Sequence, residues 1–170
     1  MNDIDVLVLH GSPGSGKSTL SRAISELLRT ADVAHAVIDI DELSIIYPHP
    51  GDSFGRDNLK AIWPNFAAVP GLKVVLPTVL ADAAELALLR AAAPSSSFVV
   101  CELTAPKEVL KERVTAREPN EFWQGRLRDF VDLYHRRTDL SEIRSFEVAT
   151  HEKSVDDAAR EVVQKAGWGR

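Results

Sequence analysis

The chain has 170 residues, of which 45% are hydrophobic and 26% are charged, and its formal net charge is −5. These values predict one globular domain with a substantial core, and no apolar run reaches the ~20 residues that a transmembrane helix requires. The negative charge and the lack of a Lys/Arg run argue against a long nucleic acid as partner, although a local basic groove is not excluded.

Two further features of composition predict a cytoplasmic location. The first residues, Met1 to Asp5, are acidic, whereas a secretory signal begins with basic residues. The single cysteine, Cys101, cannot form an intramolecular disulfide, which fits a reducing compartment. Because Cys101 lies within an apolar run, we expect it to be a buried core residue.

The first predicted strand leads directly into a glycine-rich motif. Residues 6–9 form an apolar run, and Gly11 to Ser18 then match the pattern G-x-x-x-x-G-K-[ST] before a segment of helical period begins. In such a loop the backbone N–H groups turn toward phosphates, Lys17 reaches the β- and γ-phosphates, and Ser18 ligates Mg²⁺. The residues expected to hold ATP, or a similar nucleotide, are Ser12, Pro13, Gly14, Ser15, Gly16, Lys17, Ser18 and Thr19.

The second predicted strand, residues 36–40, ends in carboxylates. Side chains alternate along a strand, so Asp39 and Asp41 are expected to point to the same side. In an open α/β sheet they would emerge at the carboxyl end, beside the phosphate-binding loop. Exposed helix-capping residues are the alternative interpretation, and the neighbouring loop favours a functional one.

The remaining elements continue the alternation of strands and helices, which predicts a parallel α/β sheet. A loop is expected at residues 47–54, and a break between two helices at 118–124. Strands are expected at 74–76, 98–101 and 146–149, and helices at about 83–92, from Pro106 and from Ser154.

The motifs favour one class of nucleotide-binding protein. A GTPase would carry an Asn-Lys-x-Asp motif, which is absent, and Asp52 to Gly55 spell D-x-x-G without an apolar strand before them. A large motor ATPase would need a strand ending in Asp-Glu. A compact kinase needs a carboxylate near the γ-phosphate and a basic flap, and both are available here.

The phosphate-binding loop, the D-x-D pair and the Arg-x-x-x-Arg spacing of Arg113 and Arg117 together resemble the small P-loop kinases. These include shikimate and gluconate kinases, chloramphenicol phosphotransferase and polynucleotide 5′-kinases, and residues 58–65 resemble an uncharacterised bacterial branch. The resemblance implies one three-layer α/β/α domain over residues 1–170, with a five-stranded parallel sheet in the order 2-3-1-4-5. It also implies ATP and Mg²⁺, with Asp41 accepting the acceptor's proton and Asp39 supporting the metal.

The same resemblance implies a lid at residues 118–128. Its arginines would approach the nucleotide, with Arg113 and Arg117 binding it and Arg117 stabilising the transferring phosphoryl group. Arg126 and Arg128 could close over the site as well. Solvated arginines paired with nearby carboxylates are the alternative.

The acceptor pocket and the metal site are less well defined by the sequence. Relatives build the pocket from a region that here includes Arg56, Trp63 and Asn65, and Asp41 and Arg126 complete the expected set. Many relatives place an acidic residue after the third strand, where this chain has Pro77. Glu102, expected at the end of the fourth strand, has the right character in another position, so metal support would rest on Ser18 and Asp39.

The expected activity is transfer of the γ-phosphoryl group of ATP to a hydroxyl of a small metabolite. Two alternatives remain open: a kinase for nucleotides or nucleic-acid 5′-hydroxyls, and a regulatory protein that hydrolyses nucleotide slowly. Because Pro77 replaces the acidic residue that helps many relatives to hold Mg²⁺, the motifs are also compatible with slow turnover.

Overall fold

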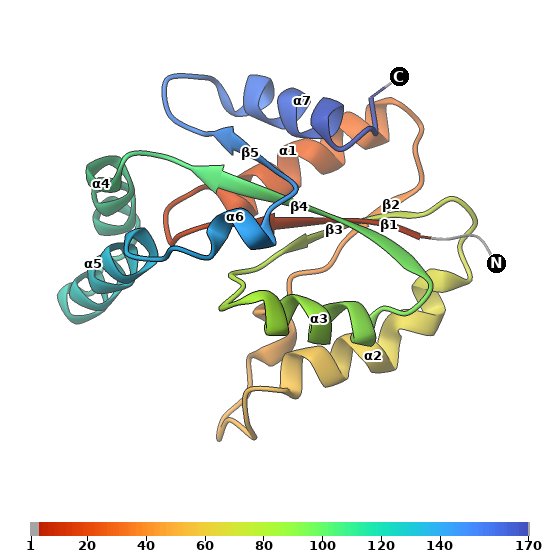
Figure 1. Ribbon diagram of the computed structural model, residues 1–170, viewed down its shortest axis with the longest axis horizontal. Helices are drawn as coiled ribbons and strands as arrows, with labels where there is room; N and C mark the ends of the chain where they lie inside the picture. Colours follow the sequence, from red (N-terminus) through yellow and green to blue (C-terminus); the bar gives the residue numbers. More distant parts are fainter. Residues whose placement is uncertain (1–3, 170) are drawn as a thin grey trace.

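Five parallel strands form the central sheet of the computed structural model, which describes residues 4–169 (Figure 1). Their order is β2-β3-β1-β4-β5, which confirms the expected topology. Met1 to Asp3, part of the acidic start considered above, lie outside the described residues. The strands are β1 (Ile4–His10), β2 (His35–Val37), β3 (Lys73–Pro77), β4 (Ser96–Thr104) and β5 (Phe146–Ala149).

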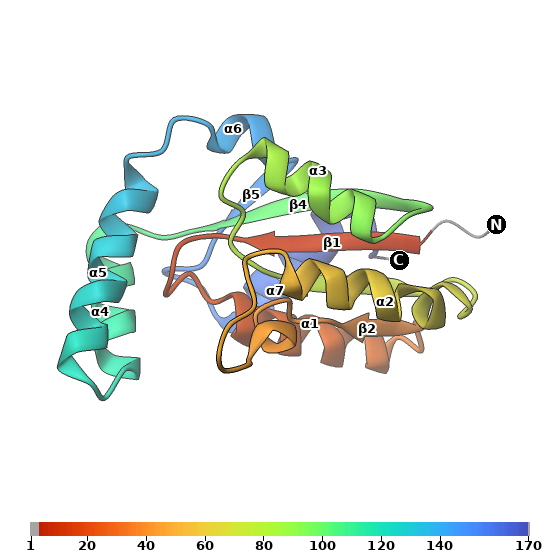
Figure 2. The same cartoon turned by 90° about the horizontal axis from the view of Figure 1, so that it is seen from below.

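Helices cover both faces of the sheet. On one face lie α1 (Lys17–Thr30) and α7 (Val155–Lys165), and on the other lie α2 (Phe54–Ala67) and α3 (Ala83–Ala92) (Figure 2). The central strand β1 alternates between two cores, with Val6 and Val8 facing α2 and α3 and Leu7 and Leu9 facing α1 and α7. Burial on both faces explains why its sequence is a continuous apolar run.

The second strand is shorter than the sequence indicates. It ends at Val37, although the Ile38 N–H still donates to the Val75 carbonyl at 2.9 Å. Asp41 has helical backbone angles (φ −66°, ψ −38°) and precedes a 3₁₀ turn, η1 (Glu42–Ser44). The prediction of a strand through residue 40, and the alternation argument for the two aspartates, are therefore wrong.

Helix α2 has no clear signal in the sequence, because Gly55, Asn58 and Pro64 all lower helix propensity. Tertiary contacts compensate for these residues. The Asn58 amide donates to the Leu43 carbonyl at 2.8 Å, and the buried indole of Trp63 donates to the Pro94 carbonyl at 3.1 Å. The expected loop at 47–54 is correct up to Ser53, and Phe54 begins the helix.

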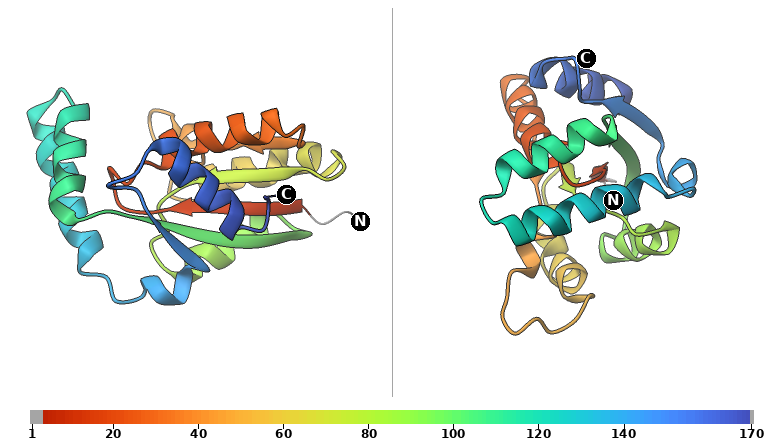
Figure 3. Two further views of the ribbon diagram at one scale, coloured as in Figure 1. Left: turned by 90° about the horizontal axis from the view of Figure 1, so that it is seen from above. Right: turned by 90° about the vertical axis from the view of Figure 1, so that its left-hand side faces the viewer.

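At the carboxyl ends of the strands, α4 (Lys107–Arg117) and α5 (Glu121–His135) form a hairpin beside the sheet (Figure 3). The break between them covers residues 118–120 rather than 118–124, because the Asn120 side chain accepts from two N–H groups of the first turn of α5 and caps it. A short helix, α6 (Leu140–Ile143), leads from the hairpin to β5. Among residues 4–169, no helix combines the length and apolar character needed to cross a membrane.

Candidate active site

The loop between β1 and α1 has the backbone conformation of an anion site. Gly14 (φ 79°) and Gly16 (φ 100°) adopt left-handed angles that favour glycine, and a Cβ on Gly14 would lie 2.8 Å from the Leu110 carbonyl oxygen. Within residues 4–169, no side chain caps the N-terminus of α1, and its first turn has no acidic residue. The N–H groups and the positive end of the helix dipole are therefore free for an anion.

Lys17 lies over this loop. Its Nζ donates to the Gly11 carbonyl at 2.8 Å and to the Ser12 carbonyl at 3.0 Å. Burial lowers the pKa of Lys17 to about 8, and the charges of Asp41 and Asp39 partly offset that shift. An ammonium has three donors, so one N–H remains for a phosphate oxygen.

A cavity of about 260 Å³ opens from the loop. It brings together residues from five parts of the chain: the loop with the start of α1, the turn after β2, the segment after β3, the end of α4, and α5. Lys17, Ser18, Asp41 and Arg117, all predicted from the sequence, line the same cavity. Its full lining is Pro13, Gly14, Gly16, Lys17, Ser18, Thr19, Asp41, Val79, Arg117 and Leu127.

The two aspartates differ in their surroundings. The Asp39 carboxylate accepts from the Asp41 N–H at 2.9 Å, so it stabilises the turn that places Asp41. The Asp41 carboxylate lines the cavity, and its pKa is raised, first by partial burial and then by the charge of Asp39, while Lys17 lowers it. Asp39 therefore stabilises the turn after β2, and its charge also raises the pKa of Lys17.

A second cavity, of about 310 Å³, adjoins the first on the side of β5 and α7. The two share Gly14, Gly16, Thr19 and Arg117, and the second adds Ser15, Leu20, Arg113, Thr150 and Val155. Arg113 makes three hydrogen bonds there: it donates to the Gly14 carbonyl at 3.2 Å and to the Thr150 side chain and carbonyl at 2.9 and 2.8 Å. Arg113 therefore braces the loop, whereas Arg117 faces both cavities.

A third, polar cavity of about 120 Å³ shares Asp41 and Val79 with the first. Arg56, expected in the acceptor pocket, is one of its lining residues, and its guanidinium lies 3.6 Å from the Glu85 carboxylate. Sequence reasoning did not select Thr78 and Glu85, and it treated Asp52 as loop chemistry. The sequence does carry a signal for Glu85, because Asp82 and Glu85 have the spacing of a helix capping box. In the structure the Asp82 carboxylate accepts from the Glu85 N–H at 2.8 Å at the start of α3.

Three residues expected at the site lie elsewhere. Trp63 is 2% exposed and belongs to the core under α2, because the helix turns this face toward the sheet. Asn65 on α2 and Arg126 on α5 are exposed and lie outside the three cavities. Arg128 lines a separate depression, of about 390 Å³, between α4 and α5.

Glu102 does not end its strand, since β4 continues to Thr104. It is instead part of a buried hydrogen-bond chain. The Leu80 N–H donates to His10 Nδ1 at 2.9 Å, so the neutral ring carries its proton on Nε2, 3.1 Å from the Tyr134 hydroxyl. That hydroxyl donates to Glu102 at 2.9 Å, and Arg144 donates to the other carboxylate oxygen at 2.6 Å.

The residues present fit a nucleotide with its metal better than a metal alone. Within the described part of the chain, no group of three or more His, Cys, Asp or Glu side chains could hold a metal ion. Mg²⁺ often keeps few protein ligands and takes the remainder from phosphates and water. Ser18 and Asp39 are the oxygen donors that could assist, while Pro77 is buried at the end of β3.

Comparison with solved structures finds the same fold in small kinases. A gluconokinase from Sinorhizobium meliloti 1021 aligns with a TM-score of 0.63 at 21% identity, over 98% of this chain and 94% of that one. A shikimate kinase from Acinetobacter baumannii, in complex with shikimate, aligns with a TM-score of 0.58 at 20% identity, over 96% and 92%. The crystal structure of APE1195 aligns with a TM-score of 0.71 at 17% identity, over 98% and 97%.

Sequence comparison identifies the family. A search of functionally curated proteins finds no match. A family model described as an AAA domain matches residues 6–136, which is most of the chain and includes the phosphate-binding loop, Asp41 and both arginines of α4. The chain therefore belongs to this AAA domain family and has the fold of the small P-loop kinases.

Proposed function

We propose that the protein is an ATP-dependent phosphotransferase that moves the γ-phosphoryl group to a hydroxyl of a small molecule. The observation that carries this proposal is the placement of the Asp41 carboxylate in the same cavity as Lys17, Ser18 and Arg117. A triphosphate on the N-terminus of α1 would bring its last phosphate toward Asp41. The likeness in fold to a gluconokinase and a shikimate kinase supports the same class of reaction.

Each part of the site has a role in this proposal. The loop N–H groups and Lys17 hold the phosphates, and the second cavity, with Val155 and Thr150, receives the nucleoside. Mg²⁺, when bound with Ser18 and Asp39, would neutralise charge on the phosphates. Arg117 compensates the negative charge that builds up on the transferring group.

The transfer step balances without a further reactant. The acceptor oxygen bonds to the γ-phosphorus, the bond to the β–γ bridging oxygen breaks, and ADP leaves. The acceptor's proton passes to Asp41, and the raised pKa of Asp41 is closer to the pKa of an effective base near neutral pH.

We also propose that residues 1–170 act as one domain in the cytoplasm, with residues 118–128 as a lid.

The test is ADP formation from Mg·ATP in the presence of pooled hydroxylated metabolites. We expect at least one pool to stimulate ADP release, and Asp41→Asn to lower that stimulated rate by ~10²-fold or more while Mg·ATP affinity is kept. Asp39→Asn is the matched control, because it should change the Mg²⁺ requirement instead.

Two results would contradict the proposal. Full stimulated turnover by Asp41→Asn would remove Asp41 as the base. Slow ADP release that no alcohol accelerates would favour the regulatory alternative, and stimulation by 5′-hydroxyl oligonucleotides alone would favour the nucleic-acid kinase.

A further inference from the structure

An apolar groove of about 530 Å³ lies beside the phosphate-binding loop and is not used by the nucleotide site described above. Phe130 and Leu133 on α5 form one wall. They are three residues apart and so share a helix face, and they are 48% and 54% exposed. The full lining is Pro13, Val79, Ala81, Phe130, Leu133, Tyr134 and Arg137.

The groove is continuous with the proposed reaction centre. Val79 lines the groove, the phosphate cavity and the polar cavity around Arg56, and Pro13 lines both the groove and the phosphate cavity. Val79 is itself 38% exposed. A molecule whose hydroxyl reaches Asp41 would therefore pass over Val79, with the apolar groove on one side and the polar cavity on the other.

The two arginines of this region are already paired. Arg137 donates to both carboxylate oxygens of Asp139 at 2.9 Å and to the Leu80 carbonyl at 2.6 Å. Arg56 faces Glu85 at 3.6 Å. Each guanidinium therefore lies beside a carboxylate, and neither adds an uncompensated positive charge to the region.

The carboxylates of the polar cavity have no such partners. Asp41 and Asp52 line it, and none of the ion pairs among residues 4–169 includes either of them. With Arg56 and Glu85 compensating each other, the charge of this cavity is negative. Burial is the main reason that the pKa of Asp41 is raised; the charges of Asp39, Glu85 and Glu42 raise it further, and Lys17 lowers it.

From these observations we infer that the acceptor is an alcohol with an apolar body and no negative charge, either neutral or cationic. Its apolar part lies on Phe130, Leu133 and Val79, and a polar or ammonium substituent faces Asp52. The inference rests on the proposed function for the position of the reacting hydroxyl. It excludes carboxylated acceptors such as gluconate and shikimate.

Three para-substituted benzyl alcohols of one skeleton test the charge preference: 4-(aminomethyl)benzyl alcohol, 4-methylbenzyl alcohol and 4-(hydroxymethyl)benzoate. Binding to the protein with Mg·ADP is followed by NMR titration at low ionic strength, together with D-gluconate, and ADP formation from Mg·ATP is measured in parallel. Molecules of this size are expected to bind with Kd of about millimolar. We expect the cationic alcohol to bind roughly five- to tenfold more tightly than the benzoate, and gluconate to bind more weakly than both.

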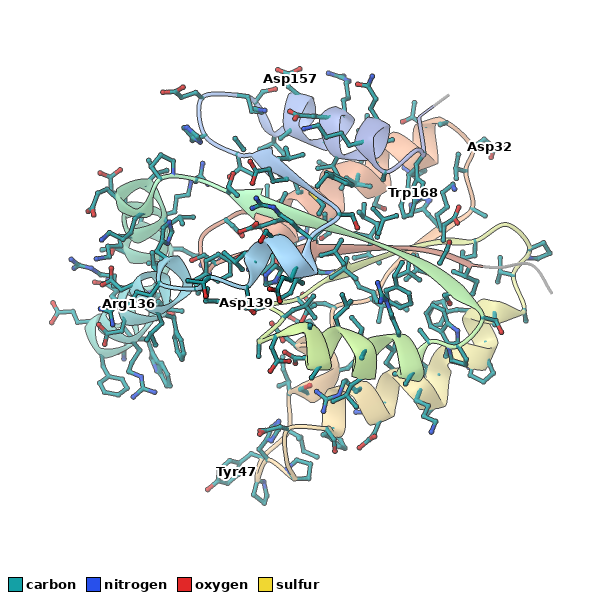
Figure 4. All side chains as sticks on the ribbon, in the orientation of Figure 1. Asp32, Tyr47, Arg136, Asp139, Asp157 and Trp168 are labelled. Atoms are coloured by element: carbon teal, nitrogen blue, oxygen red, sulfur yellow. The ribbon has the colours of Figure 1, made fainter. Side chains whose placement is uncertain are left out.

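Matched variants locate the effect. Leu133→Ala should weaken binding of 4-methylbenzyl alcohol about fivefold, because it removes apolar contact area, whereas Leu88→Ala, at a helix position with 53% exposure on α3, should leave it unchanged. Asp52→Asn should reduce the preference for the cationic alcohol. Asp32→Asn is its control, since Asp32 is exposed on the side of the molecule opposite α4 and α5 (Figure 4).

Several outcomes would overturn the inference. Preference for the benzoate or gluconate, or no binding of any aromatic alcohol, contradicts it. So does a change from dimer to monomer in Leu133→Ala with unchanged probe affinity, because a second copy would then cover the groove. Selective binding without ADP formation from any alcohol would leave the charge preference standing and count against the proposed kinase activity instead.

Discussion

At the scale of single residues, Lys17 shows how the loop is prepared for an anion. Two carbonyl groups hold its ammonium, but carbonyls are dipoles and do not supply the full negative charge that a buried cation needs. This is the reason burial lowers the pKa of Lys17 to about 8 in spite of Asp41 and Asp39. A bound triphosphate would provide that charge and favour the protonated form.

This shift predicts how nucleotide affinity depends on pH. Below pH 8 Lys17 is protonated in the free protein, and above it the free protein loses the proton that the phosphates require. Mg·ATP affinity should therefore fall as pH rises through about 8, by up to about tenfold per pH unit. Calorimetry at pH 8 in two buffers of different ionisation enthalpy should detect proton uptake on binding.

Lys17→Met provides the control for this dependence, because it keeps an unbranched side chain and has no titratable group. Its affinity should be weaker, with a flat profile between pH 7 and 9. If the variant shows the same slope as the wild type, another group is responsible and the role given to Lys17 is wrong.

At the scale of elements, the α4–α5 hairpin is tied to the rest of the protein at two places. Arg113 joins α4 to the phosphate-binding loop, and Tyr134 joins the end of α5 to His10. Between these anchors lies the proposed lid, residues 118–128, with the aromatic rings of Phe122 and Trp123 exposed and 5.3 Å apart. Neither ring is therefore buried in the core, as it would be if this segment were a fixed connection between two helices.

The proposed lid should close on nucleotide, because Arg117 lies at its start and faces both nucleotide cavities. Hydrogen exchange of residues 118–128 is expected to slow when a non-hydrolysable ATP analogue and Mg²⁺ are added, since a mobile element is only marginally stable in its open form. Residues 83–92 of α3, which line the sheet, serve as the internal reference.

An exchange rate that is already slow in the free protein, and unchanged by the analogue, would contradict the lid. Arg117→Ala adds a second criterion. It should reduce the protection that the analogue induces without altering exchange in the free protein, because its proposed partner is the nucleotide.

At the scale of the whole molecule, the hydrogen-bond network around His10 connects the sheet to the elements around the active site. His10 ends β1, Leu80 precedes α3, and Tyr134 belongs to α5. Glu102 joins the network from β4, and Arg144 joins it from the segment before β5. The buried side chains of His10, Tyr134 and Glu102 all have hydrogen-bond partners, and a satisfied buried network is rigid. The phosphate-binding loop and the base of the hairpin are thereby held in one arrangement.

Burial, followed by the charges of Arg137 and Lys17, lowers the pKa of His10 to about 4. The folded protein therefore stays unprotonated at His10 where the unfolded chain, with a pKa near 6.5, takes up a proton. The corresponding stability is fully present above pH 6.5 and is lost as pH falls toward 4, by up to about 3 kcal/mol. Urea unfolding between pH 7.5 and 4.5 measures this contribution.

His10→Gln removes the titration and serves as the comparison, because carboxylates elsewhere titrate equally in both proteins. The variant should be less stable at pH 7.5, and its stability should decline less between pH 6.5 and 4.5. Parallel curves for the two proteins would show that His10 does not titrate as inferred.

Local pattern was sufficient for much of this protein. The apolar run of β1, the loop from Gly11 to Ser18 and the Ser154 cap of α7 depend on neighbours in sequence, and the structure confirms each of them. The resemblance carried by these motifs supplied the strand order, which periodicity alone does not contain. Lys17, Ser18, Asp41 and Arg117 were predicted as site residues for the same reason, because each belongs to or follows a recognisable motif.

Only the tertiary structure decided the features that depend on distant parts of the chain. Helix α2 forms against its own propensities through contacts of Asn58 and Trp63 with residues outside the helix. The pairing of His10 with Tyr134, and the groove that Val79 shares with α5, join residues whose separation in sequence leaves no periodic signal. Their positions follow from packing across the whole sheet, and packing is not encoded by any single segment.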